Sequence, residues 1–338
     1  MSQRKDDHIQ FALAQKHGSN DFDKMRFVHT SIPSTKLEDI DISTTLGPFT
    51  LNTPFFINAM TGGSEQSLRI NEKLAYLAKA CDLVMATGSC SIALKNPALN
   101  DSFTILEKVY PEGLRFANVG AGHRSKQVNQ AVDLVKAHAC QIHVNALQEI
   151  VMPEGDKDFS SWWDDLKECV EHAKVPLIVK EVGFGMSPTT ILKLQGIGIT
   201  MIDVSGQGGT DFAWIENQRR AQPLNFFNGW GHSTLESLLS VKGKTHVDLI
   251  ASGGIRGALD IAKALAAGAK AVGLSSYFLR LVSETSLEES ITIVNQLKED
   301  LKKIMCVLDV KNVEELSKTA FICDQDLQYR VDQLINTF

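Results

Sequence analysis

The stretch Val247-Asp248-Leu249-Ile250-Ala251-Ser252-Gly253-Gly254-Ile255-Arg256-Gly257 decides how this chain folds. It opens with a mainly apolar run, as expected of a parallel strand that helices cover on both faces. Glycines then turn the chain, and Ala258, Ile261, Ala262 and Leu265 follow at helical spacing. The stretch therefore predicts a strand, a glycine-rich turn and a helix.

The same unit recurs along the chain. Eight apolar runs start 24 to 46 residues apart, which is typical of strand–helix units with two insertions. Eight such units favour an α/β fold, a closed (β/α)8 TIM barrel, over the alternative of a doubly wound sheet. The predicted strands are Phe55–Asn58, Leu83–Ala86, Arg115–Val119, Gln141–Asn145, Leu177–Glu181, Met201–Ser205, Val247–Ala251 and Ala271–Leu274.

We expect one domain over residues 1–338, with an N-terminal arm (1–53), the barrel (54–310) and a C-terminal helical tail (311–338). The segment 206–233 is too long for a simple loop and predicts an insertion after strand six. The net charge of −6 disfavours a nucleic-acid binder. No apolar run is long enough to span a membrane, no signal peptide is visible, and the six cysteines are scattered, so we expect a cytoplasmic protein.

Polar and glycine-rich residues follow all eight predicted strands, at the end where barrels carry their active sites. The turn at Gly254, Ile255 and Arg256 opens a helix, and Ser275 and Ser276 follow the next strand. Glycines let backbone N–H groups approach a phosphate at a helix N-terminus, so the pair predicts a phosphate site. The alternative is two tight turns that need glycine for their backbone angles.

Lys180 sits in an apolar strand, and a buried lysine is costly unless it meets an anion. It could be a Schiff-base nucleophile or a cation beside an electron-rich cofactor. The alternative is a lysine whose head reaches solvent from the strand end.

A polar cluster follows strand four. His143 and Asn145 share one strand face, and Gln148 and Glu149 come next. Glu149 could hold Mg²⁺ together with water and a substrate diphosphate. The alternatives are a hydrogen-bonded core histidine and a solvated helix start.

Two basic groups are weaker candidates for anion binding. Arg4, Lys5 and His8 form a cationic cluster in the arm, although the chemistry alone favours a frayed, solvated terminus. Arg219, followed by Arg220, lies in the insertion after strand six, where adjacent arginines are usually surface residues.

The assembled pattern resembles the type 2 isopentenyl-diphosphate Δ-isomerases, which are FMN-dependent (β/α)8 barrels. The resemblance covers nearly the whole chain. The glycine-rich turn is shared by many FMN barrels, but the spacing of His143, Asn145, Gln148 and Glu149 together with Arg4-Lys5 is more specific. The other matching motifs are Met60-Thr61-Gly62-Gly63, Val179-Lys180-Glu181-Val182-Gly183-Phe184-Gly185 and Gly208-Gly209-Thr210.

The resemblance implies a role for each candidate. Gln148, Lys180 and His143 would be catalytic, and Glu149 would bind Mg²⁺. Substrate would be held by Arg4, Lys5, His8, Asn145, Gln148 and Arg219, with the arm residues coming from the same or a neighbouring subunit. FMN would be held by Ala59, Met60, Thr61, Gly62, Ser89, Asn118, Lys180, Ser205, Thr210, Gly254, Ile255, Arg256, Ser275 and Ser276.

The implied reaction interconverts isopentenyl and dimethylallyl diphosphate by protonation and deprotonation, using reduced FMN and Mg²⁺, in isoprenoid precursor biosynthesis. NADPH would reduce the flavin, and the protein would be a homotetramer or larger. Two alternatives stay open at this point: an FMN oxidoreductase, such as a 2-hydroxy-acid oxidase, and a barrel that senses flavin or a phosphorylated ligand without catalysis.

Overall fold

Eight parallel strands form a closed barrel in this protein, as the sequence predicts. The computed structural model describes residues 2–15 and 18–337, with residues 2–4 described by their backbone alone. Each strand pairs with its neighbour in the chain, and the last strand closes onto the first. The barrel strands are β4 (Phe55–Ile57), β5 (Met85–Ala86), β6 (Arg115–Gly120), β7 (Ala139–His143), β8 (Leu177–Lys180), β9 (Met201–Asp203), β10 (Asp248–Ser252) and β11 (Ala271–Leu274).

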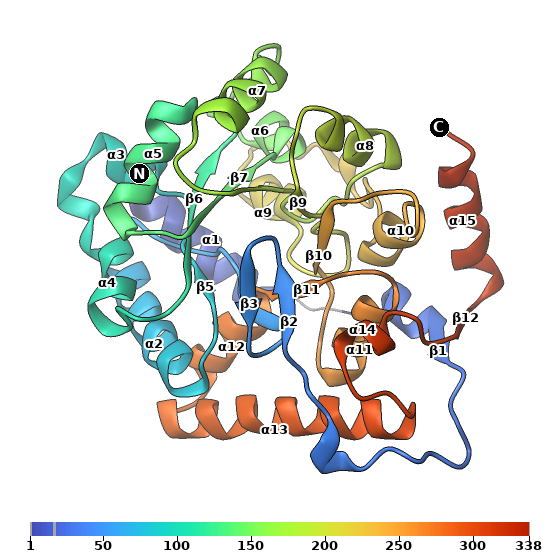
Figure 1. Cartoon of the computed structure of the whole chain (residues 1–338). Coiled ribbons are helices and arrows are strands. Elements are labelled where there is room, and N and C mark those ends of the chain that lie inside the picture. Colours follow the sequence, from blue (N-terminus) through green and yellow to red (C-terminus); the bar gives the residue numbers. More distant parts are fainter. Residues whose placement is uncertain (1, 16–17, 338) are drawn as a thin grey trace.

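Helices surround these strands (Figure 1). Because helices cover the outer face and side chains fill the interior, strands such as β8 and β11 are buried at every position. The helices between and after the strands are α2 (Glu65–Cys81), α3 (Ser91–Lys95), α4 (Asp101–Val109), α5 (Ser125–Val135), α6 (Ala146–Val151), α7 (Trp162–His172), α8 (Pro188–Gly196), α10 (Thr234–Leu239), α11 (Ala258–Ala266), α12 (Ser276–Glu284) and α13 (Leu287–Val307).

All eight predicted strands exist, but several of their predicted bounds are wrong. Leu83 and Val84 precede β5, while β7 begins at Ala139 and ends at His143. Asn145 is therefore the N-cap of α6 and lies outside the strand. Glu181 and Ser205 also lie just beyond their strands. The chain leaves the barrel where polar residues replace the apolar run, so β7, β8 and β9 end before their predicted last residues, while β5 begins later and β7 begins earlier than predicted.

A hairpin covers the amino-terminal end of the barrel. It consists of β2 (Thr44–Leu46) and β3 (Phe49–Leu51), and it lies in front of the barrel in Figure 1. Gly47 turns the hairpin with a φ of +54°, which favours glycine. Leu46 and Leu51 are fully buried, or nearly so, against Phe56 and Phe116 from the barrel interior. The hairpin is thus part of the core at this end.

The remaining elements lie outside the barrel strands and their covering helices, and one strand pair joins the two ends of the chain. Strand β1 (Met25–Phe27) pairs antiparallel with β12 (Phe321–Cys323). Between β9 and α10 lie α9 (Phe212–Gln218) and η4 (Asn225–Phe227), which occupy the predicted insertion. No helix within the described ranges is long and apolar enough to cross a membrane. The other elements are α1 (Ser2–Ala14), η1 (Asp21–Lys24), η2 (Leu37–Asp39), η3 (Pro97–Leu99), α14 (Val313–Leu316) and α15 (Gln325–Ile335).

Candidate active site

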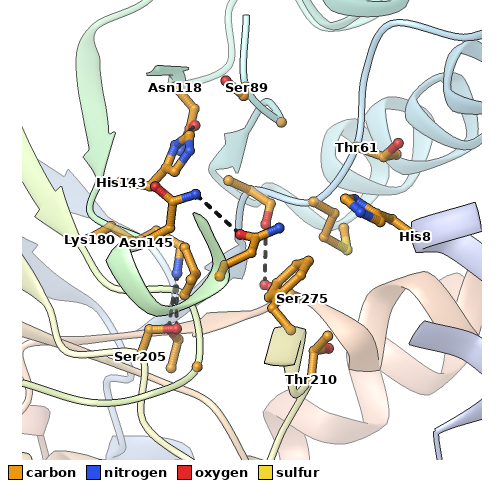
Figure 2. A pocket seen from close by; sticks show the side chains of 18 of the residues that line it. His8, Thr61, Ser89, Asn118, His143, Asn145, Lys180, Ser205, Thr210 and Ser275 are labelled. Atoms are coloured by element: carbon orange, nitrogen blue, oxygen red, sulfur yellow. Dashed lines mark hydrogen bonds between the residues drawn. The ribbon is translucent and has the colours of Figure 1, made fainter. Parts of the chain in front are cut away.

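A cavity of about 460 Å³ opens at the carboxyl ends of the barrel strands (Figure 2). Loops after all eight strands contribute to its lining, and so does α1. Most of the predicted site residues meet here. Those that line the cavity are Lys5, His8, Ala59, Met60, Thr61, Ser89, Asn118, His143, Asn145, Gln148, Glu149, Lys180, Ser205, Thr210, Gly254, Ile255, Ser275 and Ser276.

The turn after β10 presents backbone donors to this cavity, and we call residues 253–255 the glycine nest. Gly253 and Gly254 have φ of +92° and +77°. Among the described residues, nothing accepts a hydrogen bond from the N–H groups of Gly253, Gly254 or Ile255. Ser275 and Ser276 line the cavity after the adjacent strand β11. Successive backbone N–H groups in such a turn form an anion-binding concavity.

Lys180 is buried and ion-paired. Its Nζ lies 3.1 Å from Asp203 Oδ2, and Asp203 is fully buried. The ammonium also donates to the carbonyl of Glu181 at 2.9 Å and to Ser205 Oγ at 3.2 Å, a contact that Figure 2 displays. These acceptors match the three donors of an ammonium, which accounts for a lysine inside an apolar barrel.

A chain of buried amides extends from Asp203 across the barrel interior. Asn58 Nδ2 donates to Asp203 Oδ2 at 2.7 Å, and Gln141 Nε2 donates to Asn58 Oδ1 at 2.8 Å. Asn118 Nδ2 donates to Gln141 Oε1 at 3.1 Å, and Asn118 Oδ1 lies 2.8 Å from His143 Nδ1. The chain connects Lys180 to His143 beneath the cavity, with each buried amide satisfied.

His143 is neutral in this setting. Because an amide oxygen only accepts, the bond to Asn118 places the ring hydrogen on Nδ1. Burial, together with the charges of Lys5 and Lys180, lowers the pKa of His143 to about 3. The imidazole is therefore suited to hydrogen bonding through its other nitrogen, and it does not carry an acidic proton near neutral pH.

Gln148 is held in place by a buried carboxylate that the sequence analysis missed. Gln148 Nε2 donates to Glu216 Oε1 at 3.1 Å, and His8 Nε2 lies 3.0 Å from the same oxygen. Burial alone would raise the pKa of Glu216, but hydrogen bonds from His8, Gln148 and Arg219 bring it below the usual value. No motif surrounds Glu216 in the sequence; a glutamate at an apolar-facing position of α9 is the only signal.

Glu149 faces the cavity from the start of α6. Its Oε1 accepts from Asn145 Nδ2 at 2.8 Å, and its Oε2 accepts from the backbone N–H of Asp156 at 2.9 Å. Within the described ranges, no group of three or more histidine, cysteine or acidic side chains could hold a metal ion. Glu149 therefore offers a single carboxylate, which suits a cation that keeps water or ligand oxygens in its shell.

Helix α1 lies against the cavity and forms its roof. Lys5, His8, Ile9 and Ala12 line the cavity from this helix. Gln15 then anchors its end, because the Gln15 amide both donates to the Asp211 carbonyl and accepts from the Asp211 N–H, each at 3.0 Å. A frayed terminus is thus the wrong interpretation of Lys5 and His8. The side chain of Arg4 lies outside the described residues.

Three other predicted residues do not line the cavity. Arg219 forms ion pairs with Glu216 at 2.5 Å and Glu154 at 2.6 Å, so it orients a carboxylate and is not an open anion clamp. The Arg256 guanidinium contacts Asp23 at 2.6 Å and Asp260 at 2.7 Å, and so does not point to the nest. Gly62 packs against Phe103, whose ring a Cβ would meet at 2.2 Å.

Comparison with known proteins agrees with this architecture. The family model of the FMN-dependent dehydrogenases matches residues 106–323. The chain is 45% identical to an isopentenyl-diphosphate delta-isomerase of Staphylococcus aureus and 46% identical to one of Staphylococcus saprophyticus. Each match covers 98% of this chain and 96% of the relative.

Solved structures share the fold. A flavocytochrome b2 mutant with pyruvate bound has a TM-score of 0.70 at 20% identity, covering 95% of this chain and 84% of the other. A mandelate oxidase mutant with benzaldehyde has a TM-score of 0.66 at 14% identity, covering 94% of each chain. The full-length identity and the family model together lead to one assignment: this chain belongs to the FMN-dependent dehydrogenase family and, within it, to the type 2 isopentenyl-diphosphate isomerases.

Proposed function

We propose that this protein interconverts isopentenyl diphosphate and dimethylallyl diphosphate by protonation and deprotonation, with reduced FMN, Mg²⁺ and NADPH as the reductant. Family membership supports the reaction class and the flavin. One observation carries the proposal further. The polar cluster at the carboxyl end of β7, comprising His143, Asn145, Gln148 and Glu149, opens into the same cavity as Lys180 and the glycine nest.

The cavity residues fit a flavin mononucleotide. The free N–H groups of the glycine nest, with Ser275 and Ser276, would hold its phosphate. Ser205 and Thr210 would lie along the chain that joins phosphate to ring. The walls beside Lys180 would enclose the ring, and they comprise Ala59, Met60, Thr61, Ser89 and Asn118. Reduced FMN supplies, when bound, an electron-rich ring that stabilises positive charge on an alkene carbon and a nitrogen with an exchangeable proton.

The positive charge of Lys180 would favour the anionic form of the reduced flavin. The ion pair with Asp203 holds the Lys180 ammonium in position. Gln148 would orient the alkene. An amide does not readily exchange a proton, but Glu216 fixes its nitrogen and so determines which end of the amide faces the ligand. His143 would act as a neutral hydrogen-bonding group, as its lowered pKa requires.

The diphosphate would lie under the roof helix. Lys5, His8 and Asn145 line this part of the cavity and offer cationic or amide donors, and Arg4 would join them. Glu149 would hold Mg²⁺ whose other ligands are water and diphosphate oxygens. We also propose a homotetramer or larger assembly, which light scattering of the purified protein tests.

The deciding experiment incubates the full chain with isopentenyl diphosphate, FMN, Mg²⁺ and NADPH without oxygen, and measures dimethylallyl diphosphate formed per NADPH consumed. We expect many product molecules per NADPH, and no product when the flavin stays oxidised. One product per NADPH would replace the isomerase by an oxidoreductase. Flavin binding without turnover would favour a sensing barrel.

A further inference from the structure

Asn20, in the segment before η1, contacts the glycine nest from outside the cavity. Its Nδ2 donates to the Gly254 carbonyl at 2.8 Å, across 234 residues of sequence. Its Oδ1 accepts from the Phe22 N–H at 3.0 Å and so caps η1. Both partners are backbone groups of fixed polarity, so the direction of the Asn20 amide is determined.

This bond also fixes the orientation of one peptide group. The Gly254 carbonyl and the Ile255 N–H belong to the same peptide, and no described peptide bond is cis. In a trans peptide the carbonyl and the N–H point in opposite directions. Asn20 does not line the cavity, whereas Gly254 and Ile255 do. A carbonyl held toward Asn20 therefore turns the Ile255 N–H toward the cavity side.

The space around Asn20 leaves this peptide little freedom. A Cβ on Gly254 would meet Asn20 Nδ2 at 3.0 Å, and a Cβ on Gly208 would meet the Asn20 side chain at 3.1 Å. The two glycine-rich loops also pack directly, because a Cβ on Gly209 would lie 2.8 Å from the Gly254 nitrogen. Asn20 thus fills the gap between the loops after β9 and β10.

The same arm segment anchors the nest at a second point. Asp23 accepts from the Asn20 N–H at 3.0 Å and from the Arg256 guanidinium at 2.6 Å, directly after the nest. Hydrogen bonds from Arg256 and from the Asn20 backbone lower the pKa of Asp23 to about 2, so this tether stays charged at neutral pH. The arm therefore holds the nest on both sides of Ile255.

We propose that Asn20 is a positioning residue for the phosphate of the flavin: by holding the Gly254 carbonyl, it aims the Ile255 N–H at the phosphate oxygen. The inference rests on the proposed FMN site and goes beyond it, since it assigns part of the cofactor affinity to the arm. A hydrogen bond aimed at the phosphate stabilises only a flavin that has a phosphate. Asn20 should therefore affect the affinity for FMN and leave the affinity for riboflavin unchanged.

The test compares Asn20→Asp with the unaltered chain. Aspartate keeps the oxygen that caps η1, loses the donor to Gly254 and places negative charge against its carbonyl. After removal of bound flavin, the dissociation constants of FMN and riboflavin are measured by flavin fluorescence. We expect FMN binding to weaken about tenfold or more, as for loss of a charge-assisted phosphate contact, with riboflavin binding unchanged.

Two further variants separate positioning from folding. Asn20→Ser keeps a capping oxygen without the repulsion, and its FMN affinity should fall between those of the unaltered chain and Asn20→Asp. Asp326→Asn is the matched control, because Asp326 contacts Lys24 of η1 but not the nest. It should leave both flavin affinities unchanged.

The outcomes are distinguishable. An unaltered chain that binds FMN no better than riboflavin would overturn the phosphate site itself, and the role of Asn20 with it. An unaltered chain that prefers FMN, together with Asn20→Asp that keeps the full preference, would overturn the inference alone. Equal weakening of FMN and riboflavin in Asn20→Asp would reduce Asn20 to a structural role and also overturn it.

Discussion

Lys180 and Asp203 occupy the same rung of the barrel on adjacent strands, and their charged atoms lie 3.1 Å apart. His143 occupies this rung on the strand before. Three polar side chains thus stand in a row where the barrel interior gives way to the cavity. The row sets the charge beneath any ligand, because the ion pair is fixed and the imidazole is neutral.

Asp203→Asn should destabilise the protein. It leaves the Lys180 ammonium buried without a counter-ion, and breaking a buried pair in this way costs about 3–5 kcal/mol. Urea denaturation should show a drop of that size in the free energy of unfolding. The double variant Asp203→Asn with Lys180→Met should recover part of the loss, because it removes the unpaired charge. Losses that simply add would show that the ion pair is not the cause.

The neutrality of His143 predicts a pH dependence of stability. Its folded pKa of about 3 lies below the ordinary value of 6.5, so the unfolded state binds the proton first. The stabilising contribution is complete above pH 6.5 and is lost as the pH falls toward 3, by about 3 kcal/mol at pH 4. His143→Gln should flatten this part of the stability curve. In ¹⁵N-histidine NMR, a His143 signal that titrates between pH 5 and 8 would contradict the neutral assignment.

Glu216→Gln should lower turnover while FMN stays bound. The carboxylate fixes Gln148 and His8, and misplacing a group that orients the substrate costs about 10²-fold. Gln148→Ala should have a similar effect on kcat. Glu154→Gln is the matched control, since Glu154 contacts the other side of Arg219. A Glu216→Gln enzyme with normal kcat would remove Glu216 from the site.

Glu149→Gln should weaken the response to Mg²⁺. The amide keeps an oxygen for Asn145 but loses the charge that attracts the cation, so half-maximal activity should need about tenfold more Mg²⁺. FMN affinity should not change. Asp158→Asn, an exposed change outside the cavity lining, is the comparison. Identical Mg²⁺ titrations for Glu149→Gln and the unaltered enzyme would exclude Glu149 as the ligand.

Lys5→Ala should raise the KM for isopentenyl diphosphate about tenfold, because a charge-assisted contact to phosphate is lost. The melting temperature should hardly change, since no core residue is touched. Exposed Lys36→Ala supplies the control for net charge. If deletion of residues 1–8 leaves the steady-state kinetics intact, the roof helix takes no part in binding the diphosphate.

The barrel could be predicted because covered parallel strands leave a simple signal, an apolar run before each helix. The hairpin of β2 and β3 and the β1–β12 pair could not. Each strand has three residues, too few for a readable alternation, and β1 finds its partner at the opposite end of the chain.

The site could be predicted where a polar residue interrupts an apolar strand or a motif is dense, as at Lys180 and after β7. Asp203 also interrupts an apolar strand, as Lys180 does, but the sequence alone did not identify it as the partner of Lys180. The contacts of Arg219 and Glu216 could be identified only from the structure. Whether Arg219 faces a ligand or a carboxylate depends on how α9 packs against the segment after α6, and no local sequence pattern records that.

The hairpin beneath the barrel has a kinetic consequence. Leu46 and Leu51 pack against Phe56 and Phe116 and fill the amino-terminal end of the barrel interior, so the described cavity opens at the carboxyl ends of the strands. If two ligands stack along a cavity that opens at this end, the deeper one enters first and leaves last. A flavin seated against Lys180 would therefore be trapped for as long as a second molecule occupies the entrance under Lys5, and its escape rate should fall as that molecule's concentration rises.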